Sequence, residues 1–237
     1  MLTTSGFLLG GRVPYIQPAA GYRTGIEPVL LAASIAAQPG QRVLEAGLGA
    51  GAGLLCLLAR VPGIAATGVE LDPAMAGLAS HNLCGSGAAV ITGDILSVTG
   101  LASFDHAYAN PPWHDPSGTP SPNPGRRAAK QAAAGTLAAW VACLAGCVRP
   151  GGSVTVLVPA HQAGNALEAL QASTCGGRTL FPLWPKAGRD AKLVLVRGLR
   201  GRRAHGRVAP GLVLHDSGGC YTAEADAVLS KGAPLTL

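Results

Sequence analysis

The residues best suited to chemistry are four in a row, Asn110-Pro111-Pro112-Trp113. The two prolines fix successive φ angles and remove two N–H donors, and each restricts the residue before it. The Asn110 side-chain oxygen and the Pro111 carbonyl could therefore accept both hydrogens of one planar amine while Trp113 stacks on its ring. Held in this way, the nitrogen can pyramidalise and become nucleophilic with neither a metal nor a strong base. We therefore interpret all four residues as catalytic.

The alternative is an ordinary Pro-Pro turn with a tryptophan in the core. The position of the tetrapeptide favours the catalytic interpretation, because it directly follows a predicted strand, Phe104–Ala109. His114 and Asp115 come next, and we interpret both as solvated loop residues rather than proton acceptors.

A glycine-rich turn, Gly47 to Gly51, separates a predicted strand, Arg42–Glu45, from a predicted helix, Gly53–Arg60. In parallel α/β sheets such a turn meets a ligand at the carboxyl end of the strand, where glycines let the main chain approach closely. Because Glu45 would repel a pyrophosphate, the turn suits the cationic amino-acid end of S-adenosylmethionine better than a dinucleotide. The glycines assigned to this site are Gly47, Gly49 and Gly51.

Acidic residues also follow the next two predicted strands. Glu70 ends Ala65–Glu70 and can accept both hydroxyl hydrogens of a ribose, with Leu71 beside it. Asp94 follows Ala88–Ile91 and could accept from an adenine amine, with Ile95 against the ring. Each acid taken singly is equally typical of a helix N-cap or a solvated turn, but an acid after each of three successive strands indicates a cofactor site.

Strand and helix patterns alternate along the chain, which predicts a Rossmann-like α/β fold with a mostly parallel, seven-stranded sheet and a C-terminal antiparallel strand pair. We expect one domain over 1–237, with a flanking segment at 1–41, a core at 42–199 and a basic loop and tail at 200–237. Residues 1–27 are expected to be irregular or a short hairpin, and 200–211 to be disordered. The remaining predicted helices are 28–38, Pro73–Leu83, Ala128–Val148 and Gly164–Ala172, and the remaining strands are Ser153–Val158, Arg178–Leu183, Lys192–Arg197 and Leu212–His215.

Composition limits the class of protein. Apolar residues make up 48% of 237 residues and charged residues 13%, which argues against disorder, and no apolar run is long enough to span a membrane. Without a signal-peptide pattern at the N-terminus, a cytoplasmic location is expected. The six cysteines are scattered, and we expect reduced thiols and no metal site.

Charge is unevenly distributed. Nine basic residues and one acid lie between Arg178 and Arg207, whereas five acids and no Lys or Arg lie between Glu70 and Asp115. This pattern indicates a polyanion partner beside a small-molecule pocket, although a solvated arginine-rich loop would look the same. The residues assigned to RNA contact are Arg126, Arg127, Lys130, Arg200, Arg202, Arg203 and Arg207.

Taken together, these motifs resemble class I methyltransferases of the N-P-P-[YFW] group, which methylate amines. Within it the chain is similar to the tRNA adenine-N6 methyltransferases that modify valine tRNA next to the anticodon. The similarity includes the segment from Gln17-Pro18 to Ala33 and the tail around Leu212–His215 and Tyr221–Ala225. It implies S-adenosylmethionine as cofactor and adds Glu27 and Asn110 to the cofactor contacts. Departures are Glu27 and Glu45 where Asp is common, and Trp113 where Tyr is common.

Three other readings remain open at this point. Protein-glutamine methyltransferases share the tetrapeptide but carry a helical domain before the first core strand, and only 41 residues precede Arg42. A DNA adenine methyltransferase would need a target-reading domain. A silent S-adenosylmethionine-binding module that contacts RNA would not need the intact Asn110-Pro111-Pro112.

Overall fold

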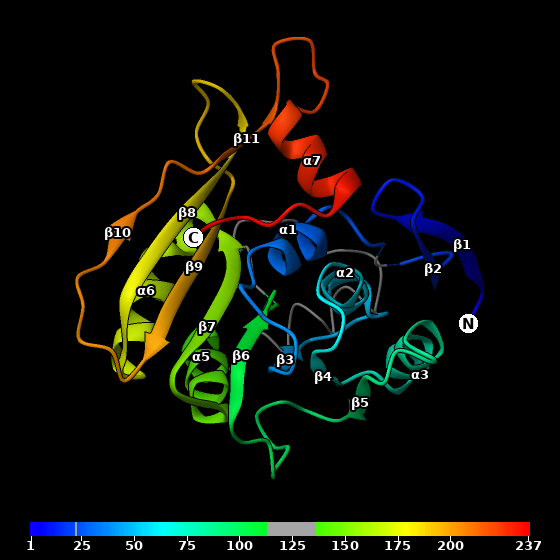
Figure 1. Cartoon of the computed structure of the whole chain (residues 1–237), viewed down its shortest axis with the longest axis horizontal. Helices are drawn as coiled ribbons and strands as arrows, with labels where there is room; N and C mark the ends of the chain where they lie inside the picture. The colour runs from blue at the N-terminus through cyan, green and yellow to red at the C-terminus, as the bar shows by residue number, and fades with distance from the viewer. Residues whose placement is uncertain (22, 113–135) are drawn as a thin grey trace.

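The computed structural model describes residues 1–21, 23–112 and 136–237 (Figure 1). The helices are α1 (Glu27–Ala33), α2 (Ala52–Arg60), α3 (Pro73–Asn82), α5 (Thr136–Cys147), α6 (Ala163–Ala172) and α7 (Ala223–Lys231), with a short 3-10 turn at Ala160–Gln162. The strands are β1 (Thr3–Leu8), β2 (Val13–Pro18), β3 (Arg42–Ala46), β4 (Ala65–Glu70), β5 (Ala89–Thr92), β6 (Phe104–Ala109), β7 (Val148–Pro159), β8 (Cys175–Lys186), β9 (Leu193–Arg200), β10 (Arg207–Val208) and β11 (Leu212–His215).

One large sheet has the strand order β10-β8-β9-β7-β6-β3-β4-β5. The remaining strand, β11, also pairs with β8, further along the strand than β10 does. All neighbours from β5 to β7 are parallel, while β9 runs antiparallel to both β7 and β8. The predicted mostly parallel sheet with an antiparallel C-terminal pair is thus confirmed. Two short strands extend the sheet along β8: β11, which was predicted at Leu212–His215, and β10, which was not.

Helices cover both faces of the sheet because strands buried on both sides carry apolar residues at successive positions. Residues of α1, α2 and α7 share one core cluster with Tyr108 and Leu195, and residues of α5 and α6 share a second cluster with Val154 and Val196. In Figure 1, α1 and α2 lie in front of the sheet, and α5 and α6 lie behind β7 and β8. The C-terminal tail returns across α1, where Leu235 N donates to Ala33 O at 2.8 Å.

The N-terminal segment forms the β1–β2 hairpin, as expected for one of the two alternatives, and it lies beside α2 and α3 (Figure 1). Asn82 at the end of α3 attaches it. Its amide nitrogen donates to Ile16 O (2.7 Å) and to Ala50 O (2.8 Å), and its oxygen accepts from Ile16 N (3.0 Å). Tyr15 is buried against Ala50. The hairpin is therefore joined to the glycine-rich turn.

Two expectations about local structure were wrong. The first helix ends at Ala33 rather than 38, because the Ser34 hydroxyl donates to Leu31 O (2.6 Å) and competes with the helical hydrogen bonds. Residues 200–211 are ordered, since they run along β8: Gly177 N donates to Ala204 O (3.0 Å) and Ala209 N to Leu180 O (2.8 Å).

Candidate functional site

The predicted site residues begin on one row across the sheet. Ala109 of β6 is the register partner of Ala46 in β3, Ala46 of Val69 in β4, and Val69 of Ile91 in β5. The next residue on each strand is therefore Asn110, Gly47, Glu70 or Thr92. Neighbouring strands are about 4.8 Å apart, so the tetrapeptide, the glycine-rich turn and the turn after β5 start within about 15 Å of one another. The last two are the cofactor loops.

The glycine-rich turn has the backbone that only glycine adopts easily. Gly47, Gly49 and Gly51 have φ values of +70°, +57° and +89°, and side chains are strained in this left-handed region. A Cβ on Gly47 would also lie 3.2 Å from the Trp140 ring, whereas a Cβ on Gly49 would meet nothing within 4 Å. The turn leads directly into α2, whose first N–H groups face the carboxyl edge of the sheet.

Glu70 holds the turn from the neighbouring strand. Its Oε2 accepts from Gly49 N (2.7 Å) and its Oε1 accepts from Asp72 N (2.9 Å). An ionised carboxylate has about four acceptor positions, so both oxygens can accept a further hydrogen bond from a diol. Leu71 follows with 57% of its surface exposed, which provides an apolar surface beside that carboxylate.

Glu45 lies beneath the turn rather than on its ligand side. It is 5% exposed, accepts from the Tyr108 hydroxyl at 3.1 Å, and its carboxylate approaches Gly53 so closely that no Cβ would fit there. Burial raises the pKa of Glu45 from 4.5 to about 8, against the opposing effects of Tyr108 and the Leu54 N–H. Glu45, which was expected to lie beside a cationic group, is therefore screened from solvent, and its raised pKa favours the neutral acid near pH 7.

Asp94 and Ile95 form a turn after β5. Asp94 is exposed, and its Oδ1 accepts from Leu96 N at 3.0 Å, which leaves acceptor positions on its carboxylate. Ile95, which was expected to contact a ring, is 3% exposed and packs in the core. Leu96, 42% exposed, offers the apolar side chain at this loop. The alternation of buried and exposed residues along a strand could not tell Ile95 from Leu96, because both lie in a turn, where that alternation ends.

The other expected residues are placed unequally. Asn110, Pro111 and Pro112 directly follow β6, with Pro111 buried and Asn110 half-buried. Glu27 begins α1, and its carboxylate folds back over Gly25. Trp113, Arg126, Arg127 and Lys130 lie outside the described residues.

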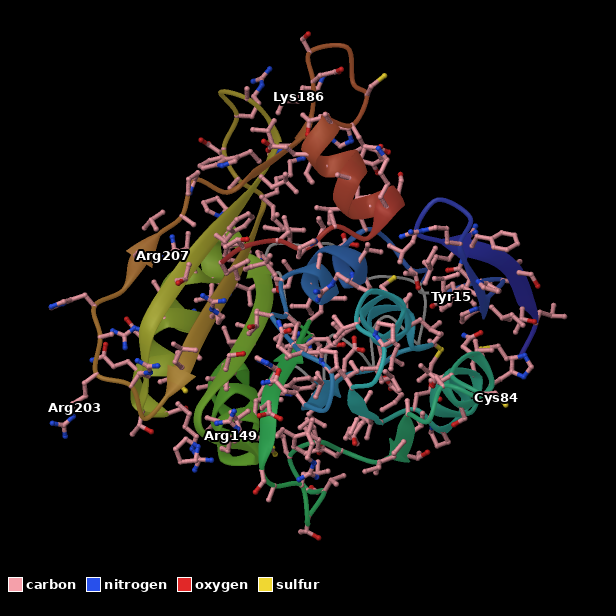
Figure 2. All side chains as sticks on the ribbon, in the orientation of Figure 1. Tyr15, Cys84, Arg149, Lys186, Arg203 and Arg207 are labelled. Carbon is pink, nitrogen blue, oxygen red and sulfur yellow. The ribbon has the colours of Figure 1, made fainter. Side chains whose placement is uncertain are left out.

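Arg202, Arg203 and Arg207 lie along one outer edge of the sheet, the basic edge, which is separated from this site. Continuing the row outward, Ala109 aligns with Val156, Val196, Leu180 and finally Val208. Arg207 is next to Val208, and Arg202 and Arg203 lie lower, past the end of β9. Figure 2 shows Arg203 and Arg207 along the outer edge of β8 and β10, with Lys186 at the opposite end of that edge.

Arg200 differs from these three residues. Its guanidinium donates to Gly146 O (3.2 Å) and to Val148 O, so it caps the end of α5. Arg202, Arg203 and Arg207 are exposed. Of the four basic residues expected to contact RNA in this region, three are therefore accessible and one supports the fold.

Sequence reasoning missed Asn82, which bridges the hairpin and the glycine-rich turn, and Tyr108, which partners Glu45. The Asn82 contacts span 66 and 32 residues, so no local pattern marks them. Tyr108 lies two positions before Asn110 in β6. A tyrosine in a buried strand needs a hydrogen-bond partner for its hydroxyl, and this requirement was the signal that could have pointed to Glu45.

Solved structures share this fold. The chain resembles a predicted O-methyltransferase from Agrobacterium tumefaciens, with a TM-score of 0.71 and 22% identity over 87% of this chain and 96% of that one. It also resembles the YcgJ protein of Bacillus subtilis (TM-score 0.53, 13% identity, 76% and 100% covered) and a geranyl diphosphate methyltransferase bound to geranyl diphosphate and sinefungin (TM-score 0.52, 14% identity, 73% and 78% covered). No protein-family model matches the sequence, and no curated protein matches it.

The fold is that of class I methyltransferases, with the strand order and the single antiparallel strand described above. Among the described residues, no helix is long and apolar enough to cross a membrane. In the same part of the chain, no three His, Cys, Asp or Glu side chains gather as metal ligands.

Proposed function

We propose that this chain is an S-adenosylmethionine-dependent methyltransferase that acts on the N6 amine of an adenine in tRNA. The observation that carries the proposal is the pairing of Ala46 with Ala109, which starts the glycine-rich turn and Asn110-Pro111-Pro112 on adjacent strands. A cofactor held by the turn and an amine held by Asn110 would therefore meet at one edge of the sheet.

The residues present suit S-adenosylmethionine, which when bound supplies an electrophilic methyl group. Glu70 has acceptor positions left for the two ribose hydroxyls, and Leu71 and Leu96 offer apolar surface to an adenine ring. Asp94 can accept from the adenine amine. The turn residues Gly47 to Gly51 present main chain to the methionine end, and Glu45 supports that turn from below.

At the acceptor, the Asn110 oxygen and the Pro111 carbonyl would take the two amine hydrogens. The nitrogen lone pair would then be free to attack, and near-contact, in-line placement of the methyl group would lower the barrier. The cofactor would supply the methyl group and keep the electrons of its S–C bond as the neutral thioether, and the amine proton would pass to water. Trp113 is assigned the stacking contact with the base.

The tRNA part of the proposal is supported by the basic edge and by the similarity of the N-terminal segment and tail. A base stacked in a loop must be splayed out to enter a pocket, and the tetrapeptide holds a ring but no phosphate. Arg202, Arg203 and Arg207, with Arg126, Arg127 and Lys130 near the tetrapeptide in sequence, are the residues proposed to hold the polyanion.

Transfer of labelled methyl groups tests the assignment. Purified protein is incubated with bulk tRNA, duplex DNA and release-factor protein, and digested RNA is analysed by mass spectrometry. We expect N6-methyladenosine in tRNA only. Label on a glutamine of the protein substrate, with none on RNA, would favour the protein-glutamine alternative and reject tRNA. Binding of the cofactor without transfer to any of the three would favour the silent module.

Two variants separate chemistry from cofactor binding. Asn110→Ala should keep cofactor affinity and lower the transfer rate by about 100-fold, as expected for the loss of one fixed polar stabiliser. Glu70→Ala should weaken cofactor binding by about 1.5–3 kcal/mol through lost hydrogen bonds to a charged group, as measured by calorimetry. Equal losses of binding and rate in Asn110→Ala would show that Asn110 is structural.

A further inference from the structure

Trp140, the fifth residue of α5, lies against the glycine-rich turn. A Cβ on Gly47 would stand 3.2 Å from its Cη2 and 3.4 Å from its Cζ3. These distances are shorter than ordinary van der Waals contact, so a side chain on Gly47 would require the ring or the turn to shift by a few tenths of an ångström. Gly47 follows β3 and Trp140 belongs to α5, so the two residues are far apart in sequence.

The same part of α5 also contacts the second cofactor loop. Cys143 Sγ donates to Ile95 O at 3.0 Å. Residues three apart lie on the same side of a helix, so one side of α5 contacts both the turn at Gly47 and the turn that begins at Asp94.

Trp140 is less buried than a core position of this helix requires. Val141 and Leu144 are 0% exposed in the core behind the sheet, whereas Trp140 is half-buried and packs only at the margin of that core. Part of a large aromatic side chain that contacts the glycine-rich turn therefore stays accessible.

We propose that Trp140 is a positioning residue for the bound cofactor, fixing the glycine-rich turn through its contact with Gly47. This inference rests on the proposed cofactor and is independent of the RNA substrate. When the cofactor fills the edge, the accessible part of the indole becomes covered.

Fluorescence tests this inference without disturbing Trp140. The chain has three tryptophans, so Trp113→Tyr with Trp184→Phe leaves Trp140 as the only one. Titration with S-adenosylhomocysteine should shift its emission and reduce acrylamide quenching at least twofold, with the dissociation constant that calorimetry gives. The control, Trp113→Tyr with Trp140→Phe, keeps Trp184, whose indole donates to Pro210 O at 3.0 Å near the far edge, and should not respond. Calorimetric binding with unchanged Trp140 emission overturns the inference.

A matched pair of glycine variants tests the contact itself. Gly47→Ala and Gly49→Ala both introduce a side chain at positive φ, but only Gly47→Ala meets the indole. We expect Gly47→Ala to weaken binding of S-adenosylhomocysteine at least tenfold more than Gly49→Ala. Adding Trp140→Leu should recover part of that loss in Gly47→Ala and none in Gly49→Ala. Equal losses, with no recovery, overturn the inference.

Failure of this inference is distinguishable from failure of the proposed function. If the parent protein does not bind S-adenosylhomocysteine, the cofactor assignment is wrong and the role of Trp140 is wrong with it. If the parent binds it and both Trp140 tests succeed while no methyl group reaches RNA, only the substrate assignment is wrong.

Discussion

Glu45 is an acid in the centre of the sheet, and burial dominates its chemistry. Its partners are the Tyr108 hydroxyl and the Leu54 N–H, while the charge of Glu70 disfavours ionisation. A neutral carboxylic acid keeps these hydrogen bonds without the cost of an unpaired buried charge. The acid that the sequence placed against the cofactor is better explained as the support on which the glycine-rich turn rests.

The raised pKa of Glu45 leads to a stability prediction. Between its ordinary value of 4.5 and about 8, the folded protein holds a proton that the unfolded chain has released, so stability is lost as pH rises through that window. The slope is about 1.4 kcal/mol per pH unit at most. Glu45→Gln keeps an acceptor for Tyr108 and removes this slope, so the variant should gain stability relative to the parent as pH rises.

Urea unfolding at pH 5, 6, 7 and 8 measures this difference. Burial lowers the pKa of His106, which acts in the opposite direction below pH 6.5, and subtracting the variant from the parent removes this shared contribution. A parent-minus-variant difference that is flat with pH would show that Glu45 is ionised in the folded protein over this range.

At the scale of elements, the Asn82 side chain joins the β1–β2 hairpin to α3 and to the glycine-rich turn. Asn82 makes all three of its hydrogen bonds to main chain, two to Ile16 in β2 and one to Ala50 in the glycine-rich turn. These groups are partly buried, so their loss is only partly compensated by water. Removal of the Asn82 side chain should therefore loosen the hairpin and the glycine-rich turn together.

Asn82→Ala should lower the free energy of unfolding by about 1–3 kcal/mol and weaken cofactor binding several-fold. The control is His81→Ala, the exposed neighbour on the same helix turn, which should change neither. Hydrogen exchange should show faster exchange at Ile16 in the Asn82 variant. Unchanged exchange there, with normal cofactor affinity, would mean that Tyr15 packing holds the hairpin by itself.

The sequence predicted the central strands well because their signal is local. Ala65–Glu70, Phe104–Ala109 and Leu212–His215 have the bounds expected from the sequence, and Glu70 at the end of the first marks the carboxyl edge. Residues 200–211 were misjudged because glycine and arginine are typical of loops. Their order comes from main-chain bonds to β8, which pair residues whose identities carry no pairing signal.

Side-chain direction in the site was less predictable than strand position. Glu45, Glu70 and Asp94 each end or nearly end a strand, yet one is buried, one holds the turn and one is exposed. Near a strand end, one residue of difference moves a side chain to the opposite face. The loops that follow then decide which face is covered, and this depends on tertiary contacts.

At the scale of the whole molecule, the row from Ile91 to Val208 gives the distance that a substrate must span. Four strand spacings separate Ala109 from Val208, or about 19 Å. Nucleic acid strands carry a charge about every 3.4 Å, so about six phosphates cover this distance. A single nucleotide at Asn110 cannot reach Arg207, and the basic edge would favour a polymer over a mononucleotide.

The two ends of that edge make a matched comparison. Arg202 and Arg203 lie at the amino end of the parallel strands, while Arg189 and Lys192 flank the β8–β9 connection at the other end, where Asp190 offsets part of their charge. Because phosphate contacts release counterions, Arg202→Glu with Arg203→Glu should weaken tRNA binding and flatten the slope of log affinity against log salt by about one to two units. Arg189→Glu with Lys192→Glu, the same charge change, should leave the slope near the parent value.

Filter binding from 50 to 200 mM salt measures both pairs, with calorimetry to check that cofactor affinity is intact. If only the second pair flattens the slope, tRNA approaches over the β8–β9 connection and the assignment of Arg202 and Arg203 is wrong. If neither pair flattens it, the basic edge is a solvated surface that does not contact tRNA.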